Sequence, residues 1–315
     1  MIVNILAVLV GVVLLAFAAD QFVIGGASLS RALRVPPIVV GVVVMGFGTS
    51  APEMIVSSIA AADGHLDLAV GNIVGSNLAN LSLLLGVGAI ITTITVSSDT
   101  VRREGPIALV AAVTFWVLVQ GDAAVWKGLV LLGGLALALG RTLYAGVRGN
   151  AEDQLGVDLD EFVGPAPRVP VEVARTLAGL IGTLVGAQTL LFGATNIAED
   201  AGLSEGFVGV SLVAFGTSLP ELVTVVQSAR RREVDLIVGN LLGSNLFNVL
   251  AVGGLAMLFG SGPVADTSLT LTGMALVTFV TALAGIFMWT GRQISRGEGA
   301  ALIVVYVVCL VLLRI

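Results

Sequence analysis

The chain has few of the residues on which soluble and disulfide-bonded proteins depend. Its 315 residues include one cysteine, one histidine and only 11% charged residues. A soluble globular domain carries about 25% charged residues, so this chain has too few to cover a water-exposed surface. The scarcity of charge also excludes a nucleic-acid binder, which needs a basic surface. The single cysteine, Cys309, excludes a disulfide framework and a cysteine-based metal site.

Hydrophobic residues dominate what is present. They make up 57% of the chain, and the mean hydropathy is +1.04. The apolar runs are long and are not alternating ten-residue segments, which favours helices over a β-barrel. A membrane-spanning helix takes about 20 residues. We predict an all-α polytopic membrane protein whose ten spans cover residues 2–30, 36–61, 67–91, 105–120, 124–145, 171–198, 204–228, 234–260, 268–290 and 298–314, with polar breaks such as 99–104 between them.

The basic residues test this division. All 15 Lys and Arg residues except Lys127 and Arg314 fall in the loops after the odd-numbered spans, or in the span ends beside those loops. The positive-inside rule then places these loops in the cytoplasm and both termini outside. The N-terminal residues lack a basic region, so we interpret them as a first span and not as a cleaved signal.

The chain repeats itself at an offset of 168 residues. Residues 40–53 read VGVVVMGFGTSAPE and residues 208–221 read VGVSLVAFGTSLPE. Residues 67–80 read DLAVGNIVGSNLAN and residues 235–248 read DLIVGNLLGSNLFN. Similarity of this extent between two halves is the mark of an internal structural repeat.

The two halves are predicted to be inverted in the membrane. Residues 1–148 form a first five-helix repeat, residues 149–170 a cytoplasmic linker, and residues 171–315 a second five-helix repeat. Because five is odd, the second copy starts on the opposite side of the membrane. Inverted repeats are typical of transporters, whose substrate site lies near the bilayer midplane where the repeats meet.

The GTSxPE motif predicts a broken helix in spans 2 and 7. Pro52 and Pro220 cannot donate a backbone hydrogen bond, and each clashes with the preceding turn. A lipid-exposed break is costly, so the break is expected to line a protein cavity. Four backbone carbonyls are expected to lose their helical partners there: those of Gly46, Thr49, Ala214 and Thr217.

The same motif places one carboxylate of each repeat at membrane depth. Ser50-x-x-Glu53 and Ser218-x-x-Glu221 match the capping box that starts a helix. A single such motif is explained by helix capping alone, but two at equivalent positions of inverted halves converge on one place. With the freed carbonyls and hydroxyls they form an all-oxygen cage, which suits a hard cation: Ca²⁺, Na⁺, K⁺ or Mg²⁺.

The second motif, GNxxGSNxxN, lies in spans 3 and 8. Its glycines favour close helix packing. Ser76 and Asn80 are four residues apart and share a helix face, as do Ser244 and Asn248. These faces are expected to complete the cage. The other amides are expected to be structural: Asn72, Asn77, Asn240 and Asn245.

GTSAPE with GNIVGSNLAN, and GTSLPE with GNLLGSNLFN, resemble the two α-repeats of the Ca²⁺/cation antiporter superfamily, and within it most of all the prokaryotic Na⁺/Ca²⁺ exchanger branch. The resemblance implies a rigid core of eight helices against which spans 1 and 6 slide. It implies Ca²⁺ ligands at Glu53, Glu221 and the Thr49 and Thr217 carbonyls. It implies further Na⁺ ligands at the Gly46 and Ala214 carbonyls, the Thr49 and Thr217 hydroxyls, Ser76 and Ser244. Ser50 and Ser218 are implied to belong to the same shell of ligands. Asn80 and Asn248 are implied to meet at the centre of the site.

Some members of the superfamily have Asp at one of the two central positions. Here both Asn80 and Asn248 are uncharged, so the two glutamates supply a fixed site charge of −2. The missing third acid argues against the K⁺-dependent branch, and the sequence after each GN is a weaker match to the H⁺/Ca²⁺ branch.

We therefore predict a secondary antiporter that exchanges Ca²⁺ for Na⁺ in a prokaryotic cell membrane. It is not an enzyme, needs no cofactor and has no evident protein partner beyond its ions and the bilayer. The alternatives are H⁺/Ca²⁺ or K⁺-dependent exchange on the same fold, or a cation channel, although two carboxylates bind a cation too tightly for rapid release. An intramembrane hydrolase is disfavoured because the only histidine lies in a loop.

Three other features of the chain have weaker interpretations. Asp20, late in span 1, is read either as an ion-pathway residue or as a polar contact on a moving helix. His65 is expected to be a solvated loop residue. The acidic loop residues Glu199, Asp200 and Glu205 are read either as attracting cations at the outer mouth or, as is usual for acidic loop residues, as simply solvated.

Overall fold

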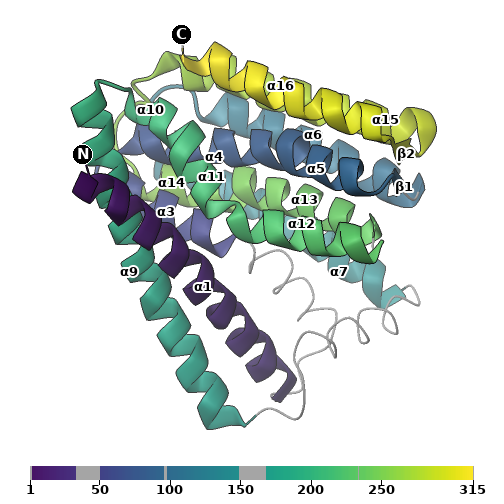
Figure 1. The fold of residues 1–315 in the computed structure, drawn as a ribbon, viewed down its shortest axis with the longest axis horizontal. Helices are drawn as coiled ribbons and strands as arrows, with labels where there is room; N and C mark the ends of the chain where they lie inside the picture. The colour runs from purple at the N-terminus through teal and green to yellow at the C-terminus, as the bar shows by residue number, and fades with distance from the viewer. Residues whose placement is uncertain (1, 33–49, 96–97, 149–167, 233, 315) are drawn as a thin grey trace.

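The computed structural model describes residues 2–32, 50–95, 98–148, 168–232 and 234–314. The fold is almost entirely helical (Figure 1). The first half of the chain forms α1 (Ile2–Ala32), α3 (Ala51–Ala62), α4 (Leu66–Leu78), the π-helical segment η2 (Ala79–Leu84), α5 (Leu85–Ile91), β1 (Ile94–Thr95), α6 (Ser98–Leu118) and α7 (Val125–Arg148).

The second half forms a matching series of elements. These are α9 (Val169–Ala201), α10 (Glu205–Val208), η3 (Gly209–Val213), α11 (Ala214–Thr217), α12 (Leu219–Arg231), α13 (Val234–Phe247), η4 (Asn248–Val252), α14 (Gly253–Phe259), η5 (Leu269–Gly273), α15 (Met274–Gly291), β2 (Gln293–Ile294) and α16 (Arg296–Arg314). A shift of 168 residues brings α3 onto α12, α4 onto α13 and α5 onto α14, with bounds that agree within one residue. The sequence repeat is therefore also a repeat of helix boundaries.

Several helices are long and apolar enough to cross a membrane. In the described ranges there are five: Leu66–Ile91, Val169–Ala201, Ile237–Phe259, Leu269–Thr290 and Arg296–Leu313, and six if the bent pair Glu205–Thr217 and Leu219–Arg230 counts as one span. One predicted boundary is wrong. The polar segment 99–104 is not a loop between two helices, because α6 already begins at Ser98 and includes it.

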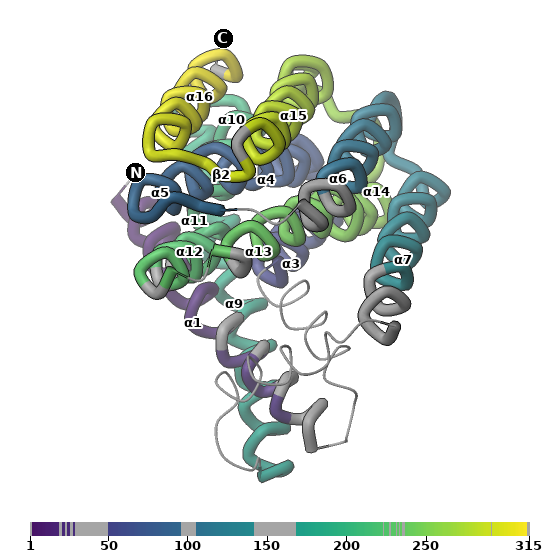
Figure 2. The backbone as a smooth tube through the Cα atoms, turned by 90° about the vertical axis from the view of Figure 1, so that its right-hand side faces the viewer, coloured from purple at the N-terminus to yellow at the C-terminus, as the bar shows by residue number. Residues whose placement is uncertain are grey.

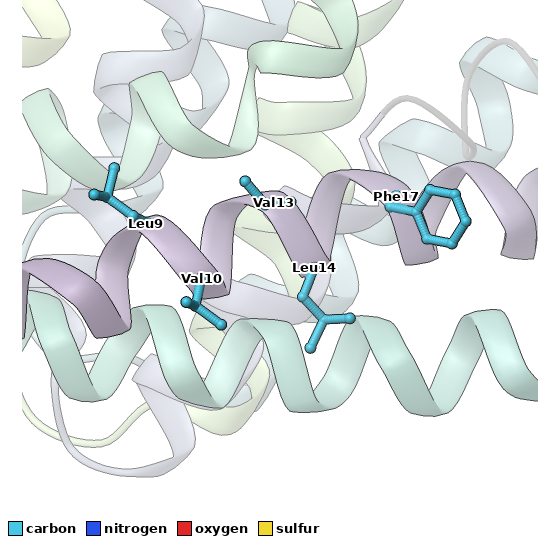
Figure 3. A pocket seen from close by; sticks show the side chains of 5 residues that line it. All are labelled: Leu9, Val10, Val13, Leu14 and Phe17. Atoms are coloured by element: carbon cyan, nitrogen blue, oxygen red, sulfur yellow. The ribbon is translucent and has the colours of Figure 1, made fainter.

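The outward face of α1 is suited to lipid. Leu9, Val10, Val13, Leu14 and Phe17 line a groove on this helix that has no polar side chain (Figure 3). Val13 is 70% exposed and Phe17 is 67% exposed. Contiguous apolar surface of this kind is rare in water and ordinary in a bilayer.

Helices α1 and α9 form a closely packed pair at one side of the molecule (Figures 1 and 2). Glycines let the two backbones approach. A Cβ added at Gly11 would lie 2.5 Å from the Leu190 nitrogen, and one added at Gly179 would lie 2.4 Å from the Phe22 nitrogen. Gly11 and Gly179 are equivalent in the repeat. Added Cβ atoms at three further glycines would come within 2.6 to 2.8 Å of backbone atoms of the facing helix: Gly25, Gly186 and Gly193.

Loops contact one another at both ends of the long helix that α4, η2 and α5 form. Beyond its C-terminal end, β1 pairs antiparallel with β2, with Thr95 opposite Gln293. At its N-terminal end, the Asp67 carboxylate accepts the Ala265 N–H at 2.7 Å. At the same end, Asp122 forms an isolated antiparallel β-bridge with Pro263. Pro263 is the repeat equivalent of Thr95 in β1. Loops that the sequence predicts on the same side of the membrane therefore contact each other.

Candidate cation-binding site

The two GTSxPE motifs form equivalent helix starts inside the protein. Ser50 is the N-cap of α3 with φ −88° and ψ 4°, and Ser218 is the N-cap of α12 with φ −86° and ψ 7°. In both helices the proline falls in the first two positions, where its missing N–H costs nothing. The axes before and after Ser218 differ by 48°. The predicted break at this point is present.

The side chains of these serines do not behave as a capping box predicts. Neither Ser50 nor Ser218 makes a side-chain cap hydrogen bond. The Ser218 hydroxyl instead donates to Glu53 Oε1 at 3.2 Å, across the boundary between the two halves. The reciprocal bond from Ser50 is absent in the described structure, where the Ser50 hydroxyl has no partner. In a capping box the serine oxygen would accept an N–H of its own helix, whereas here the Ser218 hydroxyl is a donor to a carboxylate of the facing repeat, and a hydrogen bond to an ionised acceptor is a strong one.

Both glutamates are buried at the centre of the structure. Glu53 is 1% exposed and Glu221 is 0% exposed, and the two carboxylates lie close enough for their charges to interact. Glu53 Oε2 and both carboxylate oxygens of Glu221 have no hydrogen-bond partner in the described structure. Buried polar atoms are normally paired. Oxygens of this kind, with no donor, are the ligands that a hard cation coordinates.

The second motif adds further buried oxygens. Ser76 and Asn248 are 0% and 1% exposed, and in the described part of the chain neither has a side-chain hydrogen-bond partner. The Asn80 amide donates to Asn245 Oδ1 at 3.0 Å and leaves its own oxygen unpaired. The Asn245 amide donates to the Asn77 carbonyl at 3.2 Å. Asn245 thus links the Asn77 backbone to Asn80 and holds one of the two central asparagines in place.

Asn80 and Asn248 both lie in π-helical turns, in η2 and η4 respectively. Such turns occur mostly as single-turn insertions in α-helices, frequently at functional sites. The sequence gives no direct signal for them. Ser244 is fully buried beside them, and the assignment of all these side chains as ion ligands stays a prediction.

The backbone at the helix break differs in one respect from the expectation. The Ala214 carbonyl keeps its helical partner, because it accepts the Ser218 N–H at 3.0 Å. The carbonyl that loses its partner to Pro220 is that of Gly216, four residues earlier. Thr217 ends α11 and is fully buried. Two predicted ligands, Gly46 and Thr49, lie outside the described residues.

One polar residue near the site was not singled out from the sequence. Ser57 is fully buried in α3, accepts the Asn72 amide at 2.9 Å and lies 3.4 Å from the Ala69 carbonyl to which it donates. The Asn72 oxygen accepts the Thr217 hydroxyl at 3.2 Å. Ser57 comes four residues after Glu53, so the helical period would have placed it on the same face.

His65 lies in the loop before α4, as expected, but it also has a partner that the sequence did not predict. Its Nδ1 lies 2.8 Å from Glu205 Oε1, and both side chains are partly covered. This contact joins the loop before α4 to the start of α10 and is not a freely solvated position. Asp200 accepts the Asn4 amide at 3.0 Å, and the Asp20 side chain lies outside the described ones.

The comparison with protein families agrees with this geometry. The model described as "Sodium/calcium exchanger protein" matches residues 3–143 and 172–314. The chain belongs to the sodium/calcium exchanger family. Its two matched stretches correspond to the two halves of the repeat, and the unmatched residues between them fall within the predicted linker and its flanks.

Individual relatives match this exchanger over its whole length. It is 36% identical to the putative antiporter CaxA of Alkalimonas amylolytica, covering 98% of this chain and 97% of that one. It is 30% identical to the sodium/calcium exchanger MaX1 of Methanosarcina acetivorans, covering 99% and 98%. The human sodium/potassium/calcium exchanger 3 matches only 38% of this chain and 18% of its own, at 30% identity.

A solved structure has the same fold. The sodium-calcium exchanger NCX_Mj, soaked with 2.5 mM Na⁺ and 0.1 mM Ca²⁺, matches with a TM-score of 0.68 at 29% identity over the full length of both chains. The protein is therefore an integral, multi-pass membrane protein of a transporter family. The family and the structural match together support antiport of Ca²⁺ against another cation.

Proposed function

We propose that this exchanger moves Ca²⁺ across the membrane in exchange for Na⁺ by alternating access. The observation that supports it most is the pair of fully buried glutamates, Glu53 and Glu221, one from each half of the chain. Three of their four oxygens have no donor in the described structure. Two carboxylates balance one divalent cation, and oxygen ligands without nitrogen or sulfur suit Ca²⁺ and Na⁺.

The proposed ligands surround this pair. The carboxylates and the Thr49 and Thr217 carbonyls bind Ca²⁺. For Na⁺ the proposed additional ligands are the Gly46 and Ala214 carbonyls, the Thr49 and Thr217 hydroxyls, Ser50, Ser218, Ser76, Ser244, Asn80 and Asn248. The burial of those that are described, and the contact between Ser218 and Glu53, support a shared site.

We propose ten membrane-spanning helices in two inverted repeats, with the second and seventh helices broken at Ser50 and Ser218. The recurrence of helix bounds at an offset of 168 residues supports the repeat. The loop contacts at the two ends of the bundle support the alternation of sides. The distribution of basic residues favours a cell membrane with the β1–β2 end in the cytoplasm and both termini outside. Both termini lie at the other end in Figure 1, which agrees with this orientation.

The charge of the site favours Na⁺ as the counter-ion. Two glutamates and one Ca²⁺ form a neutral site, whereas two glutamates and three Na⁺ leave one positive charge. Asn80 and Asn248 add no charge, and a K⁺-dependent exchanger is expected to carry a further acid. The printed names of two full-length matches, MaX1 and NCX_Mj, also specify sodium and calcium. Coupling to H⁺ or K⁺ is the alternative.

The close α1–α9 pair is the proposed moving element. Its glycine-lined interface keeps the two helices together, so that they shift as one body against the remaining helices and expose the site to each side in turn. Shared movement of this kind is how a carrier avoids opening a continuous pore.

Uptake of radiolabelled Ca²⁺ into proteoliposomes tests the proposal. Vesicles are loaded with Na⁺, K⁺ or buffered H⁺ in separate arms, with the membrane potential clamped in each. Ca²⁺ uptake is expected when Na⁺ leaves the vesicle and not when K⁺ or H⁺ does. Uptake that follows the H⁺ or K⁺ gradient would reject Na⁺ coupling, and uptake without any counter-ion gradient would indicate a channel.

A further inference from the structure

The Thr217 hydroxyl is held by a short chain of buried hydrogen bonds whose direction is fixed. Ser57 lies 3.4 Å from the Ala69 carbonyl, which only accepts, so the serine must donate to it. With its proton used, Ser57 accepts the Asn72 amide at 2.9 Å. The Asn72 oxygen therefore faces Thr217 and accepts the threonine hydroxyl at 3.2 Å. In this arrangement Ser57 donates to Ala69, Asn72 donates to Ser57, and Thr217 donates to Asn72.

This direction gives the single proton of the Thr217 hydroxyl an acceptor at the Asn72 oxygen. A second acceptor is in reach, since Thr217 Oγ1 is 3.3 Å from the Ala214 carbonyl. That carbonyl already accepts the Ser218 N–H at 3.0 Å, and a carbonyl oxygen has two lone pairs. If the threonine proton occupied the second lone pair, the Ala214 carbonyl would have none left for a cation. By taking the proton, Asn72 leaves this lone pair and those of Thr217 Oγ1 available.

The second repeat lacks the same support. Asn240 is the repeat equivalent of Asn72, and Val225 stands where the first repeat has Ser57. Asn240 is 2% exposed, and among the described residues neither its amide nitrogen nor its oxygen has a hydrogen-bond partner. Valine offers no acceptor, so nothing equivalent to Ser57 fixes the orientation of this amide. The two halves of the site therefore differ in how rigidly their outer residues are held.

We propose that Asn72, oriented by Ser57, is a positioning residue that keeps the Thr217 hydroxyl oxygen and the Ala214 carbonyl available to Na⁺. Because this role rests on the Na⁺/Ca²⁺ exchange proposed above, it concerns the ligands assigned to Na⁺ alone. The proposed Ca²⁺ ligands, which are the two carboxylates and the Thr49 and Thr217 carbonyls, do not depend on where the hydroxyl proton lies. Loss of the chain is thus expected to weaken Na⁺ binding and to spare Ca²⁺ binding.

The test compares Ser57→Val with Ser57→Thr. Valine and threonine have nearly the same shape, so the two variants differ only in the hydroxyl that Asn72 needs, and valine is the residue that the second repeat itself uses. Ser58→Val, one residue further along α3, is the matched control, because Ser58 makes no hydrogen bond among the described residues. Ser57→Ala, which adds no atom, gives the same comparison if the larger side chains prevent folding.

Two transport modes are measured in proteoliposomes. Release of Ca²⁺ by external Na⁺ depends on Na⁺ binding, whereas exchange of Ca²⁺ for Ca²⁺ does not. With limiting Na⁺, Ser57→Val is expected to lower the release rate about fivefold, which corresponds to about 1 kcal/mol. Saturating Na⁺ should restore the rate, and Ca²⁺/Ca²⁺ exchange should change less than about twofold. Ser57→Thr and Ser58→Val should behave as the wild type does.

The remaining outcomes overturn the proposal in recognisable ways. Equal loss in both modes, at every Na⁺ concentration, would assign Ser57 and Asn72 a purely structural role. An unchanged Na⁺ dependence in Ser57→Val would show that the hydroxyl proton does not limit Na⁺ binding. A wild-type protein that exchanges Ca²⁺ for Ca²⁺ but does not respond to Na⁺ would reject the Na⁺ coupling itself, independently of any variant.

Discussion

Replacement of Gly179 by alanine tests whether the α1–α9 interface is as close as the structure has it. The added Cβ would lie 2.4 Å from the Phe22 nitrogen, 2.7 Å from the Phe22 Cα and 2.9 Å from the Ala18 carbonyl oxygen. Ordinary contacts of a Cβ begin at 3.4 Å. All three neighbours are backbone atoms, so no side-chain rotation relieves the overlap. The two helices must instead separate by roughly 1 Å, in proportion to the shortfall in these distances.

The magnitude follows from two opposing effects. Overpacking a close interface costs about 1–3 kcal/mol, while replacing a helical glycine by alanine gains about 1 kcal/mol in propensity. Gly133 in α7 supplies the control, because an added Cβ there meets nothing within 4 Å. The propensity gain is common to both variants. The difference in stability between Gly179→Ala and Gly133→Ala should therefore equal the overpacking cost, about 1–3 kcal/mol.

Thermal unfolding of the purified protein in detergent measures this difference, and Ca²⁺ exchange in proteoliposomes measures its effect on transport. Gly179→Ala should unfold at a lower temperature than Gly133→Ala and exchange more slowly, since the helices that move are pushed apart. Gly11→Ala, at the equivalent position, should behave in the same way. Equal unfolding temperatures for Gly179→Ala and Gly133→Ala would show that the two helices are not in backbone contact.

Three further predictions concern the site and its surroundings. Glu53→Gln and Glu221→Gln each remove one of two fixed charges and should reduce Ca²⁺ transport to near background in folded protein; near wild-type uptake by either variant would contradict the site assignment. Asn248→Asp should move the voltage-sensitive step from the Na⁺-loaded to the Ca²⁺-loaded site, because the site with three Na⁺ becomes neutral and the site with Ca²⁺ becomes negative. Ca²⁺/Ca²⁺ exchange under clamped potentials should then depend on voltage, at about 2.3 kcal/mol per charge per 100 mV. An exchange rate that does not change with the clamped potential would argue against this charge balance. Lys127 donates to the Gln120 and Asp122 carbonyls at 2.5 and 2.7 Å. Lys127→Met should therefore lower the stability to thermal unfolding by about 1–3 kcal/mol and leave the Na⁺ dependence of transport unchanged. A loss of Na⁺ coupling without a loss of stability would point to a direct role in transport.

The sequence was most informative where a local rule operates. Pro52 and Pro220 predicted helix starts inside the membrane, and Ser50 and Ser218 are indeed N-cap residues. The repeat predicted equivalent elements, and helix bounds recur at the same offset. The motifs also identified the family, which the full-length matches confirm. Proline chemistry, helical period and internal repetition depend on neighbours along the chain, so they can be read before the fold is known.

The errors share a different cause. The capping box predicted that the Ser218 oxygen accepts an N–H of its own helix, but no such cap bond forms and the hydroxyl donates to the Glu53 carboxylate of the other half. His65 was expected in solvent, but the start of α10 brings Glu205 to it. The segment 99–104 was taken as a break because it is polar, although α6 passes through it. In the first two cases a partner from elsewhere in the chain outweighs the local preference, and in the third the polar residues belong to the first turns of α6 itself.

The sequence by itself determined the membrane class, the sequence repeat, the helix break at Ser218 and the pair of buried acids, because each follows from composition or spacing. Only the tertiary structure decided which oxygens have a donor and which do not. Glu53 obtains Ser218 while Glu221 obtains no donor in the described structure, and Asn72 obtains Ser57 while Asn240 has no serine to receive its amide. Hydrogen bonds are short and directional, so equivalent residues in two similar halves acquire different partners as soon as one neighbour differs.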